Sequence, residues 1–453
     1  MRNSNINNIS QRLKSDGFWV ALGRFSGIGA LVLVNVILAR VLKPSQFGAF
    51  GLLSSVAYVA SVVAMAGFNM GVVRLISESL AANDGSCIQR ILHITRNSTL
   101  VTISASALIA FCLLYHFSTT ISGGLEPIAI AFAMALCVIF LAYNNLLAAI
   151  LRGLGEARLA IFLGPQHSGG PCGSIIFIGM ILILWVLRTD ASLELVLFLF
   201  AIAYALCLPI GVAWVKVALQ RLSSRMQMVS GTSSVTATSA LKLCLPLMLS
   251  QVLSIGTRDA DLWIGGENGT TAELGFYVAA RRVVQLVAVP IGFVNLTVIA
   301  LIPELWAKRQ ITQLQFALQT AATHGAIVSF VCFLFILAAP ALILHLLFGP
   351  AYEQAARMLS ILAFGQLAFA WFGAAEMTLL MTGHSRLTVM VNAVSMMLLI
   401  VLGPFVTARW GMTGLAVFYS SIIAFQSAIL WINARLFLGI WTNATWLRRT
   451  TSS

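Results

Sequence analysis

Two adjacent arginines, Arg281 and Arg282, stand inside an otherwise apolar run, GFYVAARRVVQLVAVPIGF, which extends from Gly275 to Phe293. On a translocon-type insertion scale, an arginine at the centre of a membrane helix costs roughly 2.5 to 3.5 kcal/mol. Arginines at such positions therefore contact water, a counter-charge or a ligand. A guanidinium group binds phosphate or carboxylate oxygens through two parallel hydrogen bonds, so the pair predicts an anion site or internal salt bridges.

Further polar residues recur at the spacing of a helix face on both sides of this pair. They are Gln251, Ser254, Arg258 and Asp261 upstream, and Arg281, Gln285 and Asn295 downstream. Arg24 stands in another apolar run near the N-terminus. We predict a cationic cavity for a diphosphate, lined by Arg24, Arg258, Arg281, Arg282, Gln251, Gln285 and Asn295.

The acidic residues within apolar runs, Asp259, Asp261 and Glu376, are the candidates for ion coupling. Internal pairing is the alternative, because Arg258 and Asp261 are three residues apart and Asp259 can pair with an arginine of the next helix. These acids are too few to neutralise Arg281 and Arg282 as well. Those two arginines can instead snorkel to the outer membrane surface. For Glu376 the alternative is a helix–helix hydrogen bond.

The elements that carry these residues are membrane helices. Of the 453 residues, 59% are hydrophobic and only 9% are charged, whereas soluble domains are about one quarter charged. A membrane helix needs about 20 apolar residues, and the apolar runs predict an all-α integral membrane protein with about 12 spans. The predicted spans are Phe18–Val41, Phe47–Met70, Ile94–Phe117, Pro127–Leu151, Leu159–Leu187, Leu193–Val217, Leu241–Ile264, Leu274–Ile302, Leu318–Leu344, Met358–Met381, Leu387–Ala408 and Met412–Phe437.

The net charge of +13 does not require a nucleic-acid partner, because the distribution of Lys and Arg along the chain accounts for it. If the N-terminus is cytoplasmic, most Lys and Arg residues fall in cytoplasmic segments, which is the positive-inside pattern. Both termini are then cytoplasmic. The seven cysteines have no metal-binding spacing, so we expect no metal site. We also expect no cofactor and no catalytic residue.

A weak internal repeat predicts two six-helix, pseudo-symmetric halves. LARVLKPSQFGAF (Leu38–Phe50) and LWIGGENGTTAELGFY (Leu262–Tyr277) each run through a polar turn into the next helix, about half a chain apart. We expect an N-terminal half at 1–216, a cytoplasmic linker at 217–240, and a C-terminal half at 241–453 with a short cytoplasmic tail. Kinks are expected at Pro246 and Pro290.

Several stretches together resemble a known family. They are ILARVLKPSQFGAFGL, AGFNMGVVRLIS (Ala66–Ser77), LRGLG (Leu151–Gly155), LGFYVAARRV and LFGPAYEQAARMLSIL (Leu347–Leu362). Their order and spacing are similar to those of the polysaccharide and O-antigen flippases of the MOP superfamily, which also contains the MATE drug exporters and lipid II flippases. GPQHSGGPCG (Gly164–Gly173) departs from that pattern and predicts a broken helix.

The resemblance implies a MATE-like fold that moves polyprenyl-diphosphate-linked oligosaccharides outward across the bacterial inner membrane by alternating access. The implied partners are that glycolipid, membrane lipids and the polymerase or export machinery. A MATE-like exporter of organic cations is the alternative with the same fold, although the four arginines within spans outnumber the three acids. A membrane polymerase or glycosyltransferase is a further alternative, but the predicted outer loops are short for a catalytic domain.

Overall fold

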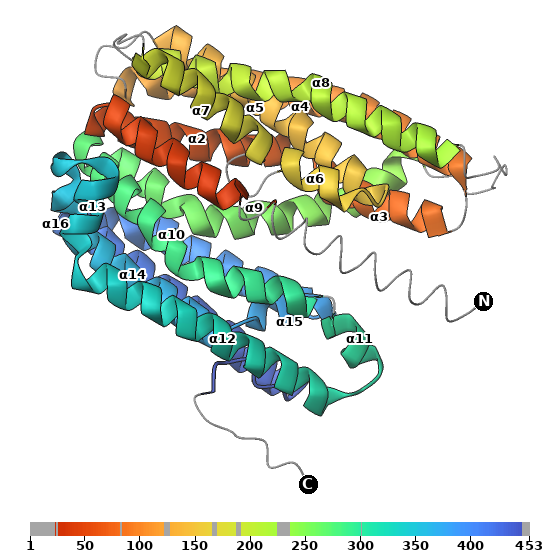
Figure 1. The fold of residues 1–453 in the computed structure, drawn as a ribbon. Coiled ribbons are helices and arrows are strands. Elements are labelled where there is room, and N and C mark those ends of the chain that lie inside the picture. Colours follow the sequence, from red (N-terminus) through yellow and green to blue (C-terminus); the bar gives the residue numbers. More distant parts are fainter. Residues whose placement is uncertain are drawn as a thin grey trace. The chain divides into compact units, whose positions relative to one another are not determined.

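The computed structural model describes residue 23 and residues 26–81, 84–121, 127–164, 170–186, 192–223, 236–299 and 301–445. Every regular element in these ranges is a helix (Figure 1). After a first helix at Ser26–Val41, they are α2 (Pro44–Ala64), α3 (Phe68–Ala81), α4 (Gly85–Ile121), α5 (Pro127–Gly153), α6 (Ala157–Leu163), α7 (Pro171–Val186), α8 (Leu193–Ser223), α9 (Ala237–Asn268), α10 (Thr271–Ile299), α11 (Leu301–Ala307), α12 (Ile311–Ala338), α13 (Pro340–Phe348), the 3-10 helix η1 (Pro350–Ala355), α14 (Ala356–Phe372), α15 (Ala375–Met381) and α16 (Ser385–Leu438).

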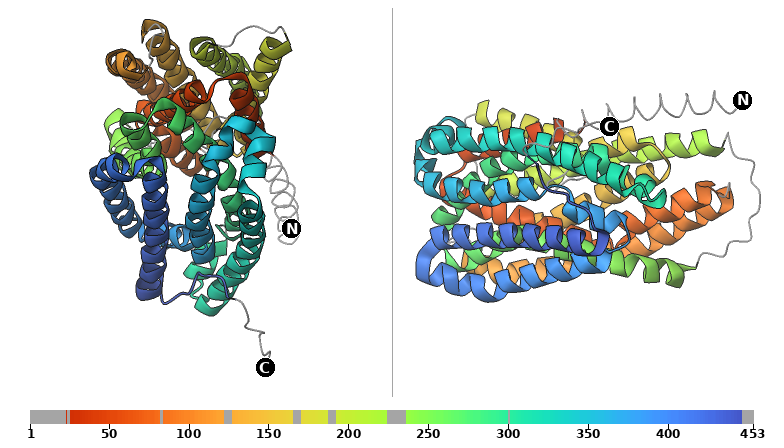
Figure 2. Two further views of the ribbon diagram at one scale, coloured as in Figure 1. Left: turned by 90° about the vertical axis from the view of Figure 1, so that its left-hand side faces the viewer. Right: turned by 90° about the horizontal axis from the view of Figure 1, so that it is seen from below.

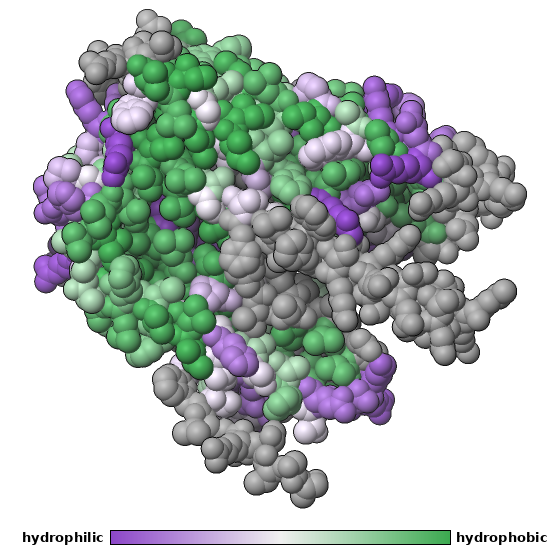
Figure 3. Space-filling view, viewed as in Figure 1, coloured by the Kyte–Doolittle hydropathy of each residue, from purple (hydrophilic) through white to green (hydrophobic). Residues whose placement is uncertain are grey.

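These helices have the length and composition of membrane spans. Within the described ranges, eight are long and apolar enough to cross a membrane, and two shorter apolar helices accompany them. The 54-residue α16 contains the last two predicted spans. Its backbone leaves the helical conformation at Gly411, which divides it into two arms. Hydrophobic residues cover much of the middle of the surface in this view, and hydrophilic residues gather toward its margins (Figure 3). The predicted class, an all-α multi-pass membrane protein, is confirmed.

The contacts between residues divide the chain into two compact units. Unit 1 comprises residues 1–42 and 50–252, and unit 2 comprises residues 43–49 and 253–453. In unit 1, α5 is central and packs against α3, α4, α6 and α8. In unit 2, α10 and α14 are central, and α12 and α16 lie alongside α14 (Figure 2). The division into six-helix halves at 217–240 stays a prediction.

In addition to Leu159–Leu187, where a break was expected, three predicted spans are interrupted in the described ranges, namely Phe47–Met70, Leu318–Leu344 and Met358–Met381. Left-handed backbone conformations break two of them, at Gly67 with φ of 81° and at Gly373 with φ of 71°. The third ends before Pro340, which begins α13 and cannot donate a backbone hydrogen bond. The break expected at residues 164–173 falls between α6 and α7, where residues 165–169 lie outside the described ranges.

The chain after α16 covers the break at Gly373. The Thr442 hydroxyl donates to the carbonyl of Phe372 over 3.1 Å, and the Ala444 amide donates to the carbonyl of Trp371 over 3.0 Å. Both carbonyls belong to the last turn of α14, and carbonyls in the last turn of a helix have no backbone N–H donor within that helix. The C-terminal segment therefore supplies hydrogen bonds that the broken helix lacks.

The two elements of the internal repeat pack against each other within unit 2. A Cβ atom at Gly48 would lie against the backbone of Gly275, and a Cβ atom at Gly275 would collide with the carbonyl of Pro44. Beside this crossing, the rings of Tyr352 and Phe47 meet edge to face, with their centroids 5.9 Å apart. This close backbone approach lies in the first turns of α10, the helix that carries the two adjacent arginines.

Candidate functional site

The α9–α10 hairpin positions most of the charged residues that the sequence analysis selected. The connection is short, and Thr270 and Glu273 cap the start of α10 reciprocally. The Thr270 amide donates to the Glu273 carboxylate over 3.2 Å, and the Glu273 amide donates to the Thr270 hydroxyl over 3.3 Å. Because the two helices run in opposite directions after this turn, Asp259 and Asp261 come to lie beside Arg281.

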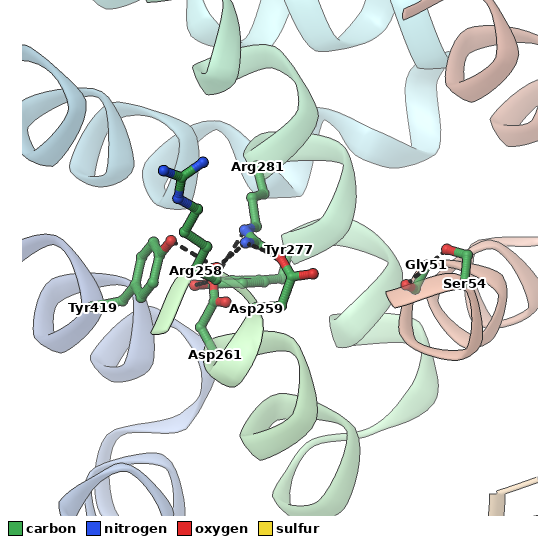
Figure 4. Close-up of polar contacts among 8 residues, drawn as sticks. All are labelled: Gly51, Ser54, Arg258, Asp259, Asp261, Tyr277, Arg281 and Tyr419. Atoms are coloured by element: carbon green, nitrogen blue, oxygen red, sulfur yellow. Dashed lines mark hydrogen bonds and ion pairs between the residues drawn. The ribbon is translucent and has the colours of Figure 1, made fainter. Parts of the chain in front are cut away.

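Arg281 is a buried residue with several oxygen partners (Figure 4). One terminal nitrogen of its guanidinium lies 2.8 Å from Oδ1 of Asp259, and Nε lies 3.2 Å from Oδ2 of Asp261. The same guanidinium donates a hydrogen bond to the backbone carbonyl of Arg258. Its Cζ lies 5.7 Å from the centroid of the Tyr419 ring, which is within the range of a cation–π interaction.

Asp261 is completely buried and depends on this arrangement. Its Oδ2 accepts a hydrogen bond of 2.7 Å from the hydroxyl of Tyr277, which is also completely buried. The hydroxyl of Tyr419 donates to the Arg258 carbonyl over 2.9 Å, so Tyr419 joins the α9 backbone to α16. Removing one member of such a buried ion pair typically costs about 3–5 kcal/mol, because the remaining charge loses its compensation.

The sequence analysis expected too few acids for Arg281 and Arg282 together, and of these two only Arg281 has acidic partners among the described residues. Both aspartates of α9 pair with Arg281, since the hairpin places them opposite it. The alternative pairing of Asp259 with an arginine of the next helix is confirmed. Arg281 therefore has its ionic partners inside the protein, and the role predicted for it as a diphosphate ligand gains no support from this geometry.

Arg282 and Arg258 have different surroundings from Arg281. The Arg282 side chain is half-buried and forms no ion pair within the ranges that the structure describes. Arg258 is exposed, and its guanidinium points away from the two carboxylates in Figure 4. Arg282 remains a candidate for binding an external anion, and the predicted role of Arg258 stays a prediction.

The other predicted site residues are placed as follows. In unit 1, Gln251 accepts a hydrogen bond of 2.6 Å from the amide of Asn69. Gln285 is half-buried on α10. Asn295 belongs to α10, but its side chain lies outside the described part, as does Arg24 altogether.

Glu376 takes part in a second polar cluster of unit 2. It accepts a hydrogen bond of 3.3 Å from the side-chain amide of Asn392, so the predicted helix–helix hydrogen bond is confirmed. Gln426 donates to Asn392 over 2.6 Å, and Thr257 of α9 donates to the Asn392 backbone carbonyl over 3.1 Å. This cluster joins α9, α15 and both arms of α16.

Sequence reasoning missed Tyr277, Tyr419 and Asn392. Each is one polar group in an apolar helix, and the available signal was that a buried hydroxyl or amide needs a partner. Tyr277 lies four residues before Arg281 and therefore on the same face of α10. Tyr419 and Asn392 are remote from α9 in sequence, so only the fold shows that they contact it.

Comparisons with known proteins agree with this fold. The family model of polysaccharide biosynthesis proteins matches residues 13–161, and the MatE family model matches residues 246–405. No curated protein matches the chain at a significant level.

Solved structures of membrane transporters superpose on most of the chain. An inward-facing multidrug resistance MATE family transporter of the MOP superfamily is 15% identical, covers 91% of this chain and 94% of its own, and has a TM-score of 0.71. The lipid II flippase MurJ in an inward closed conformation is 13% identical, with 92% and 87% covered and a TM-score of 0.68. A MOP superfamily transporter from Pyrococcus furiosus, described by the reverse polarity of its binding pocket, is 15% identical, with 93% and 94% covered and a TM-score of 0.57.

The fold is therefore that of multi-pass membrane transporters. The resemblance to the MOP superfamily is confirmed by the two family-model matches together with the shared fold. The structural neighbours include both drug exporters and a flippase, so the substrate of this chain is a separate question.

Proposed function

We propose that the chain is a flippase of the bacterial inner membrane that moves polyprenyl-diphosphate-linked oligosaccharides to the outer face for polysaccharide assembly. The observation that carries this proposal is the match of residues 13–161 to the polysaccharide biosynthesis family. The fold shared with a lipid II flippase supports it, since that protein is named for a lipid-linked substrate. Polymerase or export proteins that receive the product are its expected partners.

The charge of the α9–α10 hairpin near its buried ion pairs suits an anionic substrate. Arg258, Arg281 and Arg282 together with Asp259 and Asp261 carry one net positive charge. Because Arg281 is paired with both acids, we assign the diphosphate to Arg282. Arg258, on the same hairpin, keeps the place in the cavity that the sequence predicts for it. A guanidinium fork fits phosphate oxygens, while the polyprenyl tail stays in the bilayer.

Alternating access is the proposed mechanism, with the two halves predicted at 1–216 and 241–453 moving about a central cavity. The arginines hold the diphosphate in a hydrated cavity, where its charge is far less costly than in hydrocarbon. Both termini are cytoplasmic in this scheme. The orientation follows from the excess of Lys and Arg in the predicted cytoplasmic segments.

A MATE-like exporter of organic cations is the second candidate, because the MatE model matches residues 246–405. The experiment that separates the candidates uses purified protein in proteoliposomes with two cargoes. We expect flipping of a fluorescent polyprenyl-diphosphate glycolipid and no accumulation of ethidium under an imposed ion gradient. Ethidium transport without glycolipid flipping would favour the exporter and contradict the flippase.

A further inference from the structure

The surroundings of Arg281 consist of oxygen atoms of the kind that bind inorganic cations. Two carboxylate oxygens, from Asp259 and Asp261, and the carbonyl oxygen of Arg258 lie at its guanidinium nitrogens. The hydroxyls of Tyr277 and Tyr419 bond to two of these same oxygen groups. Carboxylates, backbone carbonyls and hydroxyls are the ligands that hard cations prefer.

The second oxygen of Asp261 adds an independent sign that this cluster accommodates a cation. Asp261 is completely buried, and its Oδ1 has no hydrogen-bond partner among the described residues. A buried carboxylate oxygen without a donor is costly, so it favours additional positive charge nearby. By themselves Asp259, Asp261 and Arg281 sum to one net negative charge, and Arg258 and Arg282 bring these five residues to one net positive charge.

We infer that Arg281 is a tethered counter-ion that fills a cation site, and that its removal opens this site to a monovalent cation such as Na⁺. The guanidinium carries one positive charge, so one monovalent ion restores the native charge of the cluster, whereas a divalent ion does not. The inference does not rest on the proposed substrate, because it concerns only the described contacts of α9, α10 and α16.

A covalently attached cation differs from a bound ion in one functional respect. It cannot dissociate on either side of a membrane, so the carboxylates beside it do not take up and release an ion during a transport cycle. In this inference Asp259 and Asp261 therefore hold a fixed positive charge, in place of the ion-coupling role that the sequence analysis predicted for them. Glu376, which lies in a separate hydrogen-bonded cluster, is not affected by this argument.

The first test uses the native protein and the variant Asp261→Asn, both full length and in detergent. Thermal unfolding is measured in Na⁺, Li⁺, K⁺ and choline chloride at equal ionic strength, and the shift relative to choline is recorded. We expect the same shift for both proteins, because neither exposes a site to exchangeable cations. A saturable Na⁺ or Li⁺ shift in the native protein that is lost in Asp261→Asn would overturn the inference.

The second test opens the site with Arg281→Met and uses Arg282→Met as a matched control on the same helix. We expect a saturable rise in melting temperature of at least about 2 °C with Na⁺ for Arg281→Met. Arg282→Met retains the tethered charge and should show no such rise. Monodisperse Arg281→Met protein that gains no monovalent-cation response, or responds only to Ca²⁺, contradicts the proposal. If Arg281→Met does not fold even in Na⁺, the comparison of native protein with Asp261→Asn decides.

Discussion

Arg281 and Arg282 are neighbours in sequence, yet their side chains have different physical roles. Successive residues of a helix point about 100° apart, so only one of the two can face the carboxylates of α9. Arg281 is 5% exposed and forms two ion pairs, whereas Arg282 is half-buried without an ion pair in the described ranges. Substitutions at the two positions should therefore fail for different reasons, one through stability and the other through substrate binding.

For Arg282 we expect a defect in substrate binding. Arg282→Ala removes a charge-assisted hydrogen bond worth about 1.5–3 kcal/mol, so half-maximal flipping should need roughly 10- to 100-fold more glycolipid. Arg282→Lys keeps the charge but loses the planar fork, and it should give an intermediate value. The measurement is the initial rate of glycolipid flipping in proteoliposomes as a function of glycolipid concentration.

The control for this prediction is Arg409→Ala, which removes an exposed arginine that lies over the ring of Trp410. Its concentration dependence should match that of the native protein. Native behaviour of Arg282→Ala at normal expression would mean that Arg282 snorkels to a membrane surface and has no part in binding.

Among the helices, close backbone packing accounts for many of the glycines in the stretches that resemble the MOP family. Gly48 and Gly275 are in contact, and Gly67 and Gly71 lie against Cys244 of α9. Helices approach this closely only where side chains are absent, as in other membrane proteins. These stretches therefore identify the fold, and they contain little information about the substrate.

Gly275 should be among the positions least tolerant of a side chain. A Cβ atom there meets the carbonyl of Pro44, which is backbone and cannot rotate away. Gly275→Ala should lower the free energy of unfolding by about 1–3 kcal/mol, as overpacking does. Gly292→Ala lies on the same helix with nothing within 4 Å of the added atom, so it should be neutral or stabilise by about 0.5–1 kcal/mol. Thermal unfolding of both purified variants tests this, and equal melting temperatures would contradict the packing argument.

The positions of the helices were largely predictable from sequence, because hydrocarbon allows few alternatives to long apolar helices. The positions at which these helices are interrupted were less predictable from sequence. A break at Gly373 needs the hydrogen bonds that Thr442 and Ala444 supply from 70 residues away, and no local pattern indicates that support. The break before α7 was predictable, because glycines and prolines are concentrated there.

The candidate site was predictable in composition but not in pairing. Periodicity placed Arg258 and Asp261 on one helix, which suggested that they pair along one turn. The structure instead pairs Asp261 across the hairpin, because Asp261 and Arg281 both face the packed side of their helices. Which of two adjacent arginines faces the carboxylates depends on the rotation of α10, and periodicity alone does not give that rotation.

For the whole molecule, orientation in the membrane is the property on which the direction of transport depends. The excess of Lys and Arg in alternate loops predicts that the linker at 217–240 is cytoplasmic and that the α9–α10 turn is outside. A reporter fused after Thr232 should therefore read cytoplasmic, and one fused after Gly269 should read periplasmic. The reverse pattern would invert the orientation and the proposed direction of flipping.

Given that orientation, the membrane potential should act on the substrate itself. A diphosphate with about two negative charges gains roughly 2.3 kcal/mol per charge for each 100 mV when it moves outward from a negative interior. If the positive charge beside α9 is tethered as Arg281, no exchangeable cation at that cluster accompanies the anion and cancels this term. An inside-negative potential of 100 mV should therefore enrich the fluorescent glycolipid in the outer leaflet by more than about tenfold over its distribution at zero potential. A polyprenyl glycoside without the diphosphate is the matched control and should show no enrichment. Equal distributions of the diphosphate lipid at both potentials would mean that cations bound at another group accompany the lipid and cancel its charge. Glu376 would then be the first residue to substitute in a search for that group.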